Sequence, residues 1–550
     1  MTEGMYMDRK IAVIGISLCF PSAENKEDFH TLLAEGREAQ PCDEIIARRG
    51  DLVGIDDYKS YLKNTRLIHG IEFFDHKFYG IFKREALEIP PEMRMTINHV
   101  HELFQDAGYS SERLKKTVCG AITTQSSVRY QELISKPSFL SFFNGMSAMT
   151  GGYLSHYFDM RGPVVNVDST CSSSLLAVAQ ACDMLMLGRA DMMVAGGVQL
   201  FLPTSQQESN DMFSKTMGLS SESCLPFDAR ASGFFSGEGA GFVLLKRYEE
   251  AIRDRDHIYG VILGSGMSSN GDRCSTIYAP CGDAQIESLK QAFERSEISA
   301  DDITEVEAHG AATLQGDKAE IESLKEILKN RKKAEPVLLT SVKSNFGHTV
   351  HAAGIAGLLK VLSGFEHNMI YPISGFHEPN AALDFENSHL KPFSQAVSVD
   401  KDTVRTAVIG SYGLNEMNVH MIVQNYRNSG TDPSEIEEKN TMLCLTASDE
   451  ERVHMFCENV RKDIISSKYN INDLIYTLNS GRDVYPYRAV FNFSTKDELL
   501  EKLTAPEIIK ADAEETDIYS KKWYDEEKYY RVPTAHYPMK PAVNWPSVKV

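Results

Sequence analysis

The chain has 550 residues, more than one domain usually holds, so we expect several folding units or one large duplicated fold. Apolar residues make up 42% and charged residues 24%, values typical of a globular protein with a substantial core. The formal net charge of −20 repels phosphate backbones and anionic lipids, which argues against nucleic acid and membranes as partners. An acidic protein partner would need a local basic patch.

Ten cysteines are scattered along the sequence without a C-x-x-C pair, so zinc-ribbon and thioredoxin-type sites find no support. The N-terminal segment has charged residues but no long apolar run after them, so neither a signal peptide nor a membrane span is expected. Both patterns are typical of a cytoplasmic protein with reduced thiols.

In the first half of the sequence, apolar runs typical of buried strands alternate with segments of helical periodicity. Strands are expected at 10–17, 118–125 and 191–200. Helices are expected at 25–36, at 90–108 with prolines at the start, and between 172 and 188. Residues 37 to about 80 are expected to be irregular.

The alternation begins again near residue 258, with strands expected at 258–268, 303–310, 336–347 and 406–414 and helices at 283–296 and 317–328. Two such halves predict a layered α/β fold with a large sheet, consistent with a duplication.

The C-terminal part differs in composition from these two halves. Residues 427–440 are polar and turn-rich, as in a linker, and a small α/β unit follows. The last segment is rich in Tyr and Pro, and it must lie along another surface to be ordered. We therefore predict a core at 1–426, a flanking α/β subdomain at 427–510 and an extended tail at 511–550.

Cys171 lies between a strand-like run that ends at Asp168 and the helix expected after Ser172. Free backbone amides and the positive end of the helix dipole favour a thiolate there and lower the thiol pKa. The same amides would hold an anionic oxygen on an attached acyl group. A buried structural cysteine is the alternative, and the junction alone does not decide between the two.

Two later loops carry histidines. His309 follows a strand in EVEAHGAATLQGD, and His348 lies in SVKSNFGHTVHAAGIAG, five residues after Lys343. Each lies between a strand and a helix, where side chains project into a shared cleft in layered α/β folds. One such histidine is more often structural, but a thiol and two loop histidines together favour a catalytic site.

These stretches resemble the β-ketoacyl synthases, specifically the ketosynthase domains of modular polyketide synthases. The nucleophile motif of that family is similar to VDSTCSSSLLAV, and its two histidine loops are similar to EAHGAATLQGD and KSNFGHTVHAAGIAG. Further family segments match AVIGISLCFPSA, FFDHKFYGIFKREAL and PFDARASGFFSGEGAGFVLLK in the same order. The resemblance covers about residues 9 to 425.

The resemblance implies a thiolase-like fold with two related layered α/β halves, a small C-terminal α/β linker subdomain and a homodimer. It also implies a tail that wraps back onto the core, because VPTAHYPMKPAVNW resembles the family's tail pattern, with Met539 where an aromatic residue is usual. The linker subdomain is not followed by an acyltransferase. By resemblance, this indicates a polyketide synthase of the type in which a separate acyltransferase acts in trans.

The activity implied by the resemblance is a decarboxylative Claisen condensation. Cys171 would take an acyl chain from the phosphopantetheine arm of an acyl carrier protein, and a malonyl-loaded carrier would then enter. His309 and His348 would donate hydrogen bonds to the malonyl thioester oxygen, and Lys343 would orient the site. No bound metal or redox cofactor is expected, and GEGAG at 237–241 lacks the spacing of a dinucleotide fingerprint.

One loop departs from the family pattern S-x-F-G-F-G-G-T-N-A-H, because this chain has GSYGLNEMNVH at 410–420. Leu414 occupies the gating position whose backbone amide completes the oxyanion hole with that of Cys171. Asn415 and Glu416 replace glycines, and Asn tolerates a positive φ better than Glu. Either the loop is re-routed with the amide still in place, or the gating is altered and condensation is lost.

Two smaller departures are HGAAT in place of HGTGT and IPPEMR in place of DPQQR. Cys171 and His309 are nevertheless retained, which counts against relatives that lack the first histidine or carry Ser or Gln as nucleophile.

Three functions therefore compete. A condensing enzyme leads, followed by a specialised or branching ketosynthase that transfers acyl chains between carrier proteins without extending them. A Cys/His hydrolase leaves the second histidine loop and the tail unexplained.

Overall fold

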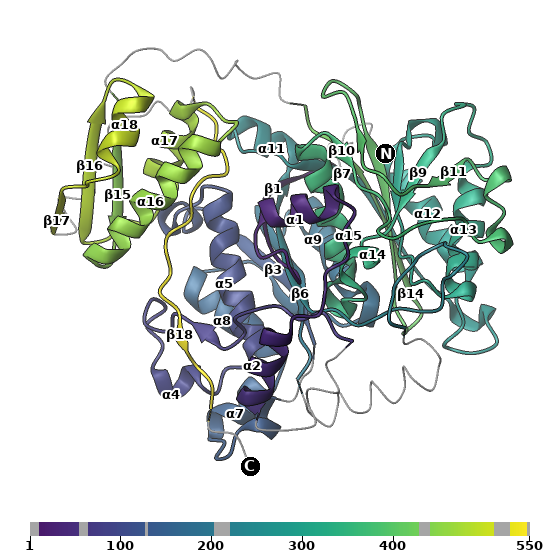
Figure 1. Ribbon diagram of the computed structural model, residues 1–550, viewed down its shortest axis with the longest axis horizontal. Helices are drawn as coiled ribbons and strands as arrows, with labels where there is room; N and C mark the ends of the chain where they lie inside the picture. Colours follow the sequence, from purple (N-terminus) through teal and green to yellow (C-terminus); the bar gives the residue numbers. More distant parts are fainter. Residues whose placement is uncertain are drawn as a thin grey trace, which may run out of the picture.

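The central feature of the molecule is an eleven-stranded mixed sheet with the order β11-β9-β8-β13-β14-β7-β1-β6-β5-β3-β4 (Figure 1). We describe it from a computed structural model that covers residues 10–53, 64–126, 130–202, 221–427, 441–510 and 529–546. Residues 428–440 of the expected linker at 427–440, and the first part of the expected tail, 511–528, lie outside the described residues.

The strands of the sheet run through most of the sequence. They are β1 (Ile11–Cys19), β3 (Cys119–Gln125), β4 (Val164–Asn166), β5 (Met192–Gln199), β6 (Gly239–Arg247), β7 (Gly260–Ser269), β8 (Glu305–Glu307), β9 (Val337–Thr340), β11 (Leu390–Pro392), β13 (Thr406–Tyr412) and β14 (Met417–Gln424). Two short strands outside it, β10 (Met369–Ile370) and β12 (Val397–Ser398), pair with each other.

The two halves of the sheet share one topology. In the first half β1 pairs antiparallel with β6, β6 antiparallel with β5, and β5 and β4 each pair parallel with β3. The second half repeats this order and these directions. There β7 pairs antiparallel with β14, β14 antiparallel with β13, and β13 and β9 each pair parallel with β8; β11 is added parallel to β9 at the edge. The halves meet where β1 pairs with β7, so the predicted duplication is present in the strand order.

Two apolar helices fill the space between the halves. Most residues of α9 (Ser173–Met186) and nearly all residues of α15 (Ala353–Glu366) are buried, and both helices share one hydrophobic cluster with β1, β6 and β14. A helix that is apolar on all sides is stable only where other elements cover it completely. Each of these helices begins directly after a loop with predicted site residues.

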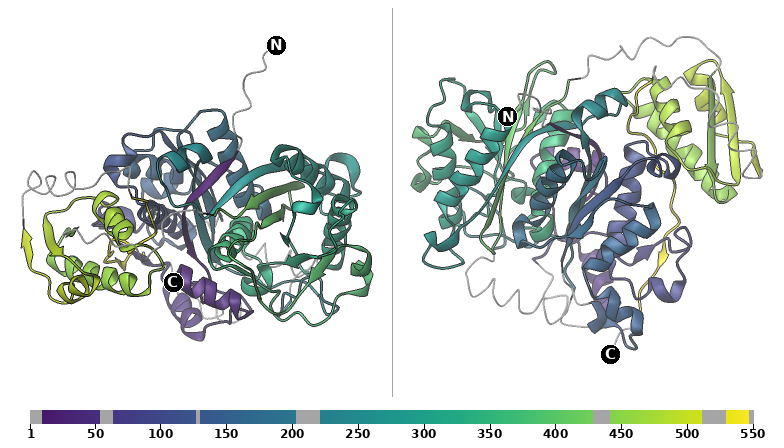
Figure 2. Two further views of the ribbon diagram at one scale, coloured as in Figure 1. Left: turned by 90° about the horizontal axis from the view of Figure 1, so that it is seen from above. Right: turned by 180° about the vertical axis from the view of Figure 1, so that it is seen from behind.

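Outer helices cover the other faces of the sheet (Figure 2). Amphipathic α5 (Pro91–Asp106), α12 (Gly282–Ser296) and α13 (Leu314–Leu328) place their apolar residues in a second cluster against the strands. Among the described residues of the core, the remaining α-helices are α1 (Lys26–Ala34), α2 (Asp43–Val53), α4 (Lys83–Ala86), α6 (Ser111–Leu114), α7 (Phe139–Asn144), α8 (Ala148–Phe158), α11 (Tyr248–Arg253) and α14 (Lys343–Phe346).

Two of these helices differ from the sequence prediction. The stretch expected to be irregular contains α2, whose Arg49 is 2% exposed and forms a bidentate ion pair with Glu238, at 2.7 and 2.9 Å. The expected strand at 336–347 ends at Thr340, and α14 follows it. In both places long-range contacts determine the local conformation.

A separate three-stranded sheet with its own core follows at residues 441–510. It consists of β15 (Thr441–Ala447), β16 (Tyr487–Phe493) and β17 (Ile508–Lys510), covered by α16 (Glu450–Ser466), α17 (Ile471–Ser480) and α18 (Lys496–Lys502). Figure 1 shows this unit beside the N-terminal half of the core, next to α5 and α11.

The end of the chain lies back along the core as an extended segment (Figure 1). Arg531 forms an ion pair of 2.6 Å with buried Asp256, and Tyr537 packs on Phe78 and Tyr485. Further on, β18 (Ala542–Val543) pairs antiparallel with β2 (Phe73–Phe74). Residues 529–546 therefore join the small sheet to the core.

Within the described residues, no helix is both long and apolar enough to cross a membrane. The same part of the chain has no group of three or more His, Cys, Asp or Glu side chains placed to hold a metal ion.

Candidate active site

Cys171 lies in a short 3-10 turn, η2 (Thr170–Ser172), directly before the buried helix α9. Thr170 has a φ of +54°, in the left-handed region that β-branched residues rarely adopt. Strain of this kind persists only where the surrounding structure enforces it, and it is commonly found at functional sites. The carbonyl of Cys171 accepts a hydrogen bond of 2.9 Å from the Ser411 hydroxyl, which connects the turn to β13.

The predicted lowering of the Cys171 pKa is wrong for the free protein. Burial raises the pKa of the Cys171 thiol, and this effect outweighs the Lys343 ammonium, the Thr170 hydroxyl and the backbone amides of Leu414 and Cys171. The backbone amides at the helix start lower the thiol pKa as expected, but the desolvation of the thiol outweighs them. The thiolate therefore needs the Lys343 charge and the nearby amides when it forms.

His309 lies in the loop between β8 and α13, where Glu320 fixes its backbone. The Glu320 carboxylate accepts hydrogen bonds from the amides of His309, at 2.7 Å, and Gly310, at 2.8 Å. The Tyr412 amide donates to Nδ1 of His309 at 3.2 Å, so Nδ1 is an acceptor and the neutral ring carries its proton on Nε2. His309 is therefore oriented as a hydrogen-bond donor.

His348 follows α14 and is 4% exposed. The Val350 amide donates to its Nδ1 at 3.1 Å, which again leaves the proton on Nε2. Its ring lies edge-on to Phe234, with 4.8 Å between the ring centroids. The loop before it is closely packed, because a Cβ on Gly347 would lie 2.4 Å from the Phe235 ring, and φ at Gly347 is +72°.

The two imidazoles lie close together and both are neutral. Their centroids are 5.8 Å apart, and the rings are nearly perpendicular. Burial, reinforced by the nearby Lys343 charge, holds the pKa of His309 and of His348 well below the usual range. Two neutral Nε2–H donors are suited to an oxygen that gains negative charge, because they stabilise it without giving up a proton.

Lys343 connects the nucleophile to both histidines. Its ammonium is 3.4 Å from Nδ1 of His309 and also donates to the His309 carbonyl. Its charge acts on Cys171 and on His348 as well. Burial lowers the pKa of Lys343, while the nearby Cys171 and Glu320 act in the opposite direction. The structure therefore brings together the four residues selected from the sequence.

The departing loop, the segment 410–420 that differs from the family pattern, contains the turn between β13 and β14. The Leu414 amide donates to the Thr170 hydroxyl at 2.7 Å, beside Cys171, and the Leu414 side chain is 41% exposed. The positive φ of the turn, +72°, lies at Glu416, and Asn415 is not among the residues with positive φ. The backbone amide is thus near the nucleophile, and Glu416, not Asn415, adopts the conformation usual for glycine.

Sequence reasoning missed residues that hold the site in place. Glu320 lies in the helix after the HGAAT segment, and Tyr412 lies in the departing loop, where a comparison of side chains with the family pattern could have revealed it. Asp317 is a third such residue: burial raises its pKa to about 7, and it accepts a hydrogen bond of 2.8 Å from the Phe227 amide.

Three other histidines, His351, His367 and His420, contact residues of the surrounding fold. Nδ1 of His351 lies 2.9 Å from the Gln199 side chain, and His367 stacks on His30 with 3.7 Å between the ring centroids. His420 lies below the departing loop, with Nδ1 2.8 Å from the Ser288 hydroxyl.

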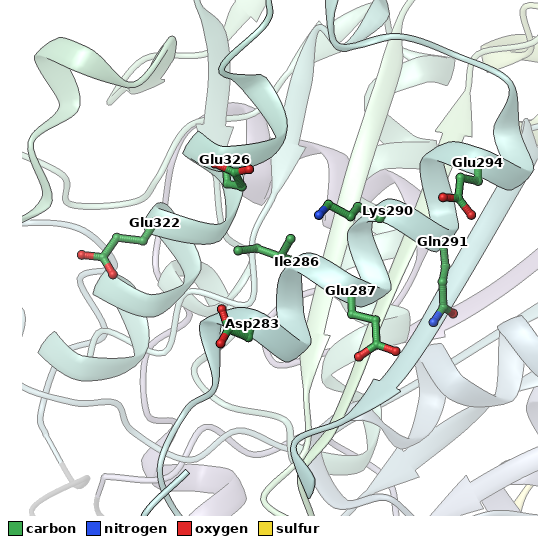
Figure 3. A pocket seen from close by; sticks show the side chains of 8 residues that line it. All are labelled: Asp283, Ile286, Glu287, Lys290, Gln291, Glu294, Glu322 and Glu326. Atoms are coloured by element: carbon green, nitrogen blue, oxygen red, sulfur yellow. The ribbon is translucent and has the colours of Figure 1, made fainter. Parts of the chain in front are cut away.

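A groove of about 820 Å³ between α12 and α13 is separate from these residues (Figure 3). It is mainly acidic, and none of the predicted site residues lines it; its lining consists of Asp283, Ile286, Glu287, Lys290, Gln291, Glu294, Glu322 and Glu326.

Comparison with protein families gives two adjacent matches. The description "Beta-ketoacyl synthase, N-terminal domain" matches residues 8–251, and "Beta-ketoacyl synthase, C-terminal domain" matches residues 259–377. The chain belongs to the β-ketoacyl synthase family. The boundary between the two matches coincides with the start of the second half of the sheet.

Solved ketosynthases of polyketide synthases have the same fold as this chain. The ketosynthase from module 6 of the bacillaene synthase of Bacillus subtilis 168 superposes with a TM-score of 0.85 and 28% identity, covering 98% of this chain and 100% of that one. The ketosynthase from module 1 of the bacillaene synthase of Bacillus amyloliquefaciens FZB42 gives 0.85 and 27%, with the same coverage. The predicted thiolase-like fold is confirmed, and this chain is a polyketide-type ketosynthase.

The curated relatives are much longer than this ketosynthase. Polyketide synthase PksL of Bacillus subtilis (strain 168) is 31% identical over 512 residues, which are 90% of this chain and 11% of that protein. Polyketide synthase PksM of the same strain is 32% identical over 516 residues, 90% of this chain and 12% of that protein. The chain thus spans about a tenth of their length.

Proposed function

We propose that this ketosynthase extends polyketide chains by decarboxylative Claisen condensation between an acyl group on Cys171 and a malonyl group on an acyl carrier protein. The observation that carries the proposal is the pair of neutral Nε2–H donors, His309 and His348, beside a cysteine at the start of a helix. Simple acyl transfer needs the cysteine and its amides, whereas a second pair of donors suits a second developing oxyanion.

In the loading step the Cys171 sulfur attacks the thioester of an acyl group on the phosphopantetheine arm. The arm leaves as a thiol and takes the proton that Cys171 gives up, so no external base is consumed. The amides of Cys171 and Leu414 stabilise the tetrahedral oxyanion, and Lys343 stabilises the thiolate. The arm belongs to the carrier protein and is not a cofactor of this chain.

In the second step the bond between the malonyl α-carbon and its carboxylate breaks, and carbon dioxide leaves. The electron pair remains on the thioester as an enolate, whose oxygen accepts hydrogen bonds from Nε2 of His309 and His348. The α-carbon then attacks the acyl carbonyl on Cys171, and the sulfur leaves as a thiolate. Because both rings are neutral, they stabilise the enolate without protonating its carbon.

We further propose that the protein works as a homodimer. Apolar side chains of α7 and the following residues are exposed, with Phe139 at 74%, Phe142 at 64% and Met146 at 44%. Val165 is 41% exposed on β4, which forms an edge of the described sheet. An exposed apolar patch and a free sheet edge are both surfaces that a second copy can cover.

A second candidate function is acyl transfer between carrier proteins without extension, as in a specialised or branching ketosynthase. The observation in its favour is the turn with Leu414, Asn415 and Glu416, in which a charged residue adopts a positive φ beside the oxyanion amide. The Leu414 amide still lies beside Thr170, which supports the condensing function instead.

One experiment separates these functions. The protein is loaded from an acyl carrier protein, a malonyl carrier protein is added, and the masses of all three proteins are followed. Acylation of Cys171 and a ketoacyl carrier product, in which the acyl chain is extended by the decarboxylated malonyl unit, support condensation, whereas acylation and transfer without extension contradict it. Cys171→Ala must abolish loading, and loading that persists shows that another residue is the nucleophile.

A further inference from the structure

Three polar side chains, those of Glu320, Tyr412 and His420, lie close together beside Gly410. A Cβ on Gly410 would lie 3.2 Å from Oε1 of Glu320, 3.2 Å from the Tyr412 hydroxyl and 3.4 Å from Nε2 of His420. The Tyr412 hydroxyl is 3.1 Å from Nε2 of His420 and is close enough to the Glu320 carboxylate to interact with it. The family pattern has phenylalanine at the position of Tyr412, so this hydroxyl distinguishes the present chain from that pattern.

The protons in this cluster have two consistent arrangements. In the first, the Tyr412 hydroxyl donates to Nε2 of His420, and Nδ1–H of His420 donates to Ser288. In the second, Ser288 donates to Nδ1 of His420, Nε2–H donates to the Tyr412 oxygen, and Tyr412 donates to Glu320. Both arrangements satisfy every donor, because in the first the Ser288 hydroxyl donates to the Gln285 carbonyl at 3.0 Å. Only the second places a hydrogen bond on a carboxylate, and a bond to an ionised acceptor is the stronger kind.

We propose that the Tyr412 hydroxyl is a positioning group that donates the third hydrogen bond to the Glu320 carboxylate and accepts one from Nε2–H of His420. This inference rests on the proposed condensing function. The other two bonds of Glu320 come from the amides of His309 and Gly310, so Tyr412 completes the support of the His309 loop.

Tyr412 supports His309 twice, through its side chain and through its backbone. Its amide donates to Nδ1 of His309 at 3.2 Å, and the two rings are 5.0 Å apart. Anchoring the hydroxyl between Glu320 and His420 holds that amide in place. The direction in which Nε2 of His309 points therefore depends on the hydroxyl.

Glu320 is surrounded by titratable groups on several elements. Lys343 on α14 and Asp317 on α13 act on it through their charges, and His309, Tyr412 and His420 face it from the neighbouring loop and strands. Burial raises the pKa of Glu320, and the Tyr412 hydroxyl opposes that rise. Without the hydroxyl, Glu320 takes up a proton at higher pH and no longer balances the charge of Lys343.

The test combines Tyr412→Phe with two measurements. The first is loading of Cys171, which we expect to stay within about twofold of the wild type. The second is decarboxylation of malonyl carrier protein, for which kcat should fall about tenfold with KM unchanged. The acid limb of its pH profile should move to higher pH, because a bond to the ionised form of Glu320 is lost.

Tyr371→Phe is the matched control. Its hydroxyl is also buried, with His30 Nδ1 at 2.7 Å and Ser363 at 3.0 Å, but it lies outside the site. We expect this variant to lose a similar amount of stability and to keep the wild-type decarboxylation rate and pH profile. An equal loss in both variants would show that the effect of Tyr412→Phe is only structural and would overturn the proposal.

A direct measurement does not depend on condensation. Nitrogen NMR of the histidine-labelled wild type should show His420 with its proton on Nε2, and Tyr412→Phe should change the Nε2 shift. A proton on Nδ1 would overturn the proposal, because Tyr412 would then donate to His420 and not to Glu320. If the wild type loads but never condenses, the proposed function fails while this measurement still tests the role of Tyr412.

Discussion

Gly413 is the residue of the departing turn at which a single methyl group should have the greatest effect. A Cβ built there would lie 2.2 Å from the Ser169 carbonyl oxygen and 2.7 Å from the Ser172 hydroxyl. Both atoms belong to the segment that carries Cys171, and the carbonyl is backbone that cannot rotate away. Gly413→Ala therefore forces the turn and the Cys171 segment apart.

The size of the effect follows from that geometry. Real Cβ atoms essentially never approach another heavy atom more closely than 3.0 Å, so the turn must move by about 1 Å. The Leu414 amide is the next group in the chain and moves with it, away from Thr170 and the oxyanion on Cys171. A displacement of this size at a reacting centre, or the loss of one oxyanion donor, costs about a hundredfold in rate.

The assay is the rate of Cys171 acylation by an acyl carrier protein, followed by the intact mass of the ketosynthase. Gly152→Ala is the matched control, because its Cβ would meet only the flexible Met149 side chain, at 3.8 Å, within α8. We expect Gly152→Ala to load at the wild-type rate and Gly413→Ala to load about a hundredfold more slowly. Thermal unfolding of both variants shows whether each remains folded.

Gly413→Ala that loads within threefold of the wild-type rate would refute this reasoning. It would show that the turn can shift without carrying the Leu414 amide away from Cys171, or that this amide does not serve the oxyanion.

Three further predictions follow from the buried charges and donors. His309→Ala should load Cys171 within a few fold of the wild type but decarboxylate malonyl carrier protein about a hundredfold or more slowly, as carbon dioxide release would show. Burial lowers the pKa of His101 to about 4 and that of His420 to about 3, so the unfolded chain binds more protons below pH 6.5. The urea midpoint should therefore fall as the pH drops from 6.5 to 4, and a flat profile would contradict this. Arg531→Met removes one of the two cations, Arg531 and Lys246, that pair with buried Asp256. The free energy of unfolding measured in urea should fall by about 3 kcal/mol. An unchanged midpoint would show that this contact of the tail contributes little to stability.

The order of strands and helices could be predicted because it depends on local patterns. Residues 90–108 begin with prolines and have apolar residues at helical spacing, and α5 covers Pro91–Asp106. The predicted helix at 172–188 is likewise α9, Ser173–Met186. By contrast, α2 has a weak local pattern, and its Arg49 is held by Glu238, a residue 189 positions away. A contact over that distance leaves no signature in the nearby sequence.

The sequence by itself determined which residues form the candidate site: a cysteine before a helix, two loop histidines and a lysine, in a motif order that resembles one family. Tertiary structure alone decided how those groups are tuned. The sign of the Cys171 pKa shift depends on desolvation by the surrounding fold, and the tautomer of His309 depends on the Tyr412 amide, 103 residues away. Desolvation and hydrogen-bond partners are sums over the whole fold, so no local pattern of residues contains them.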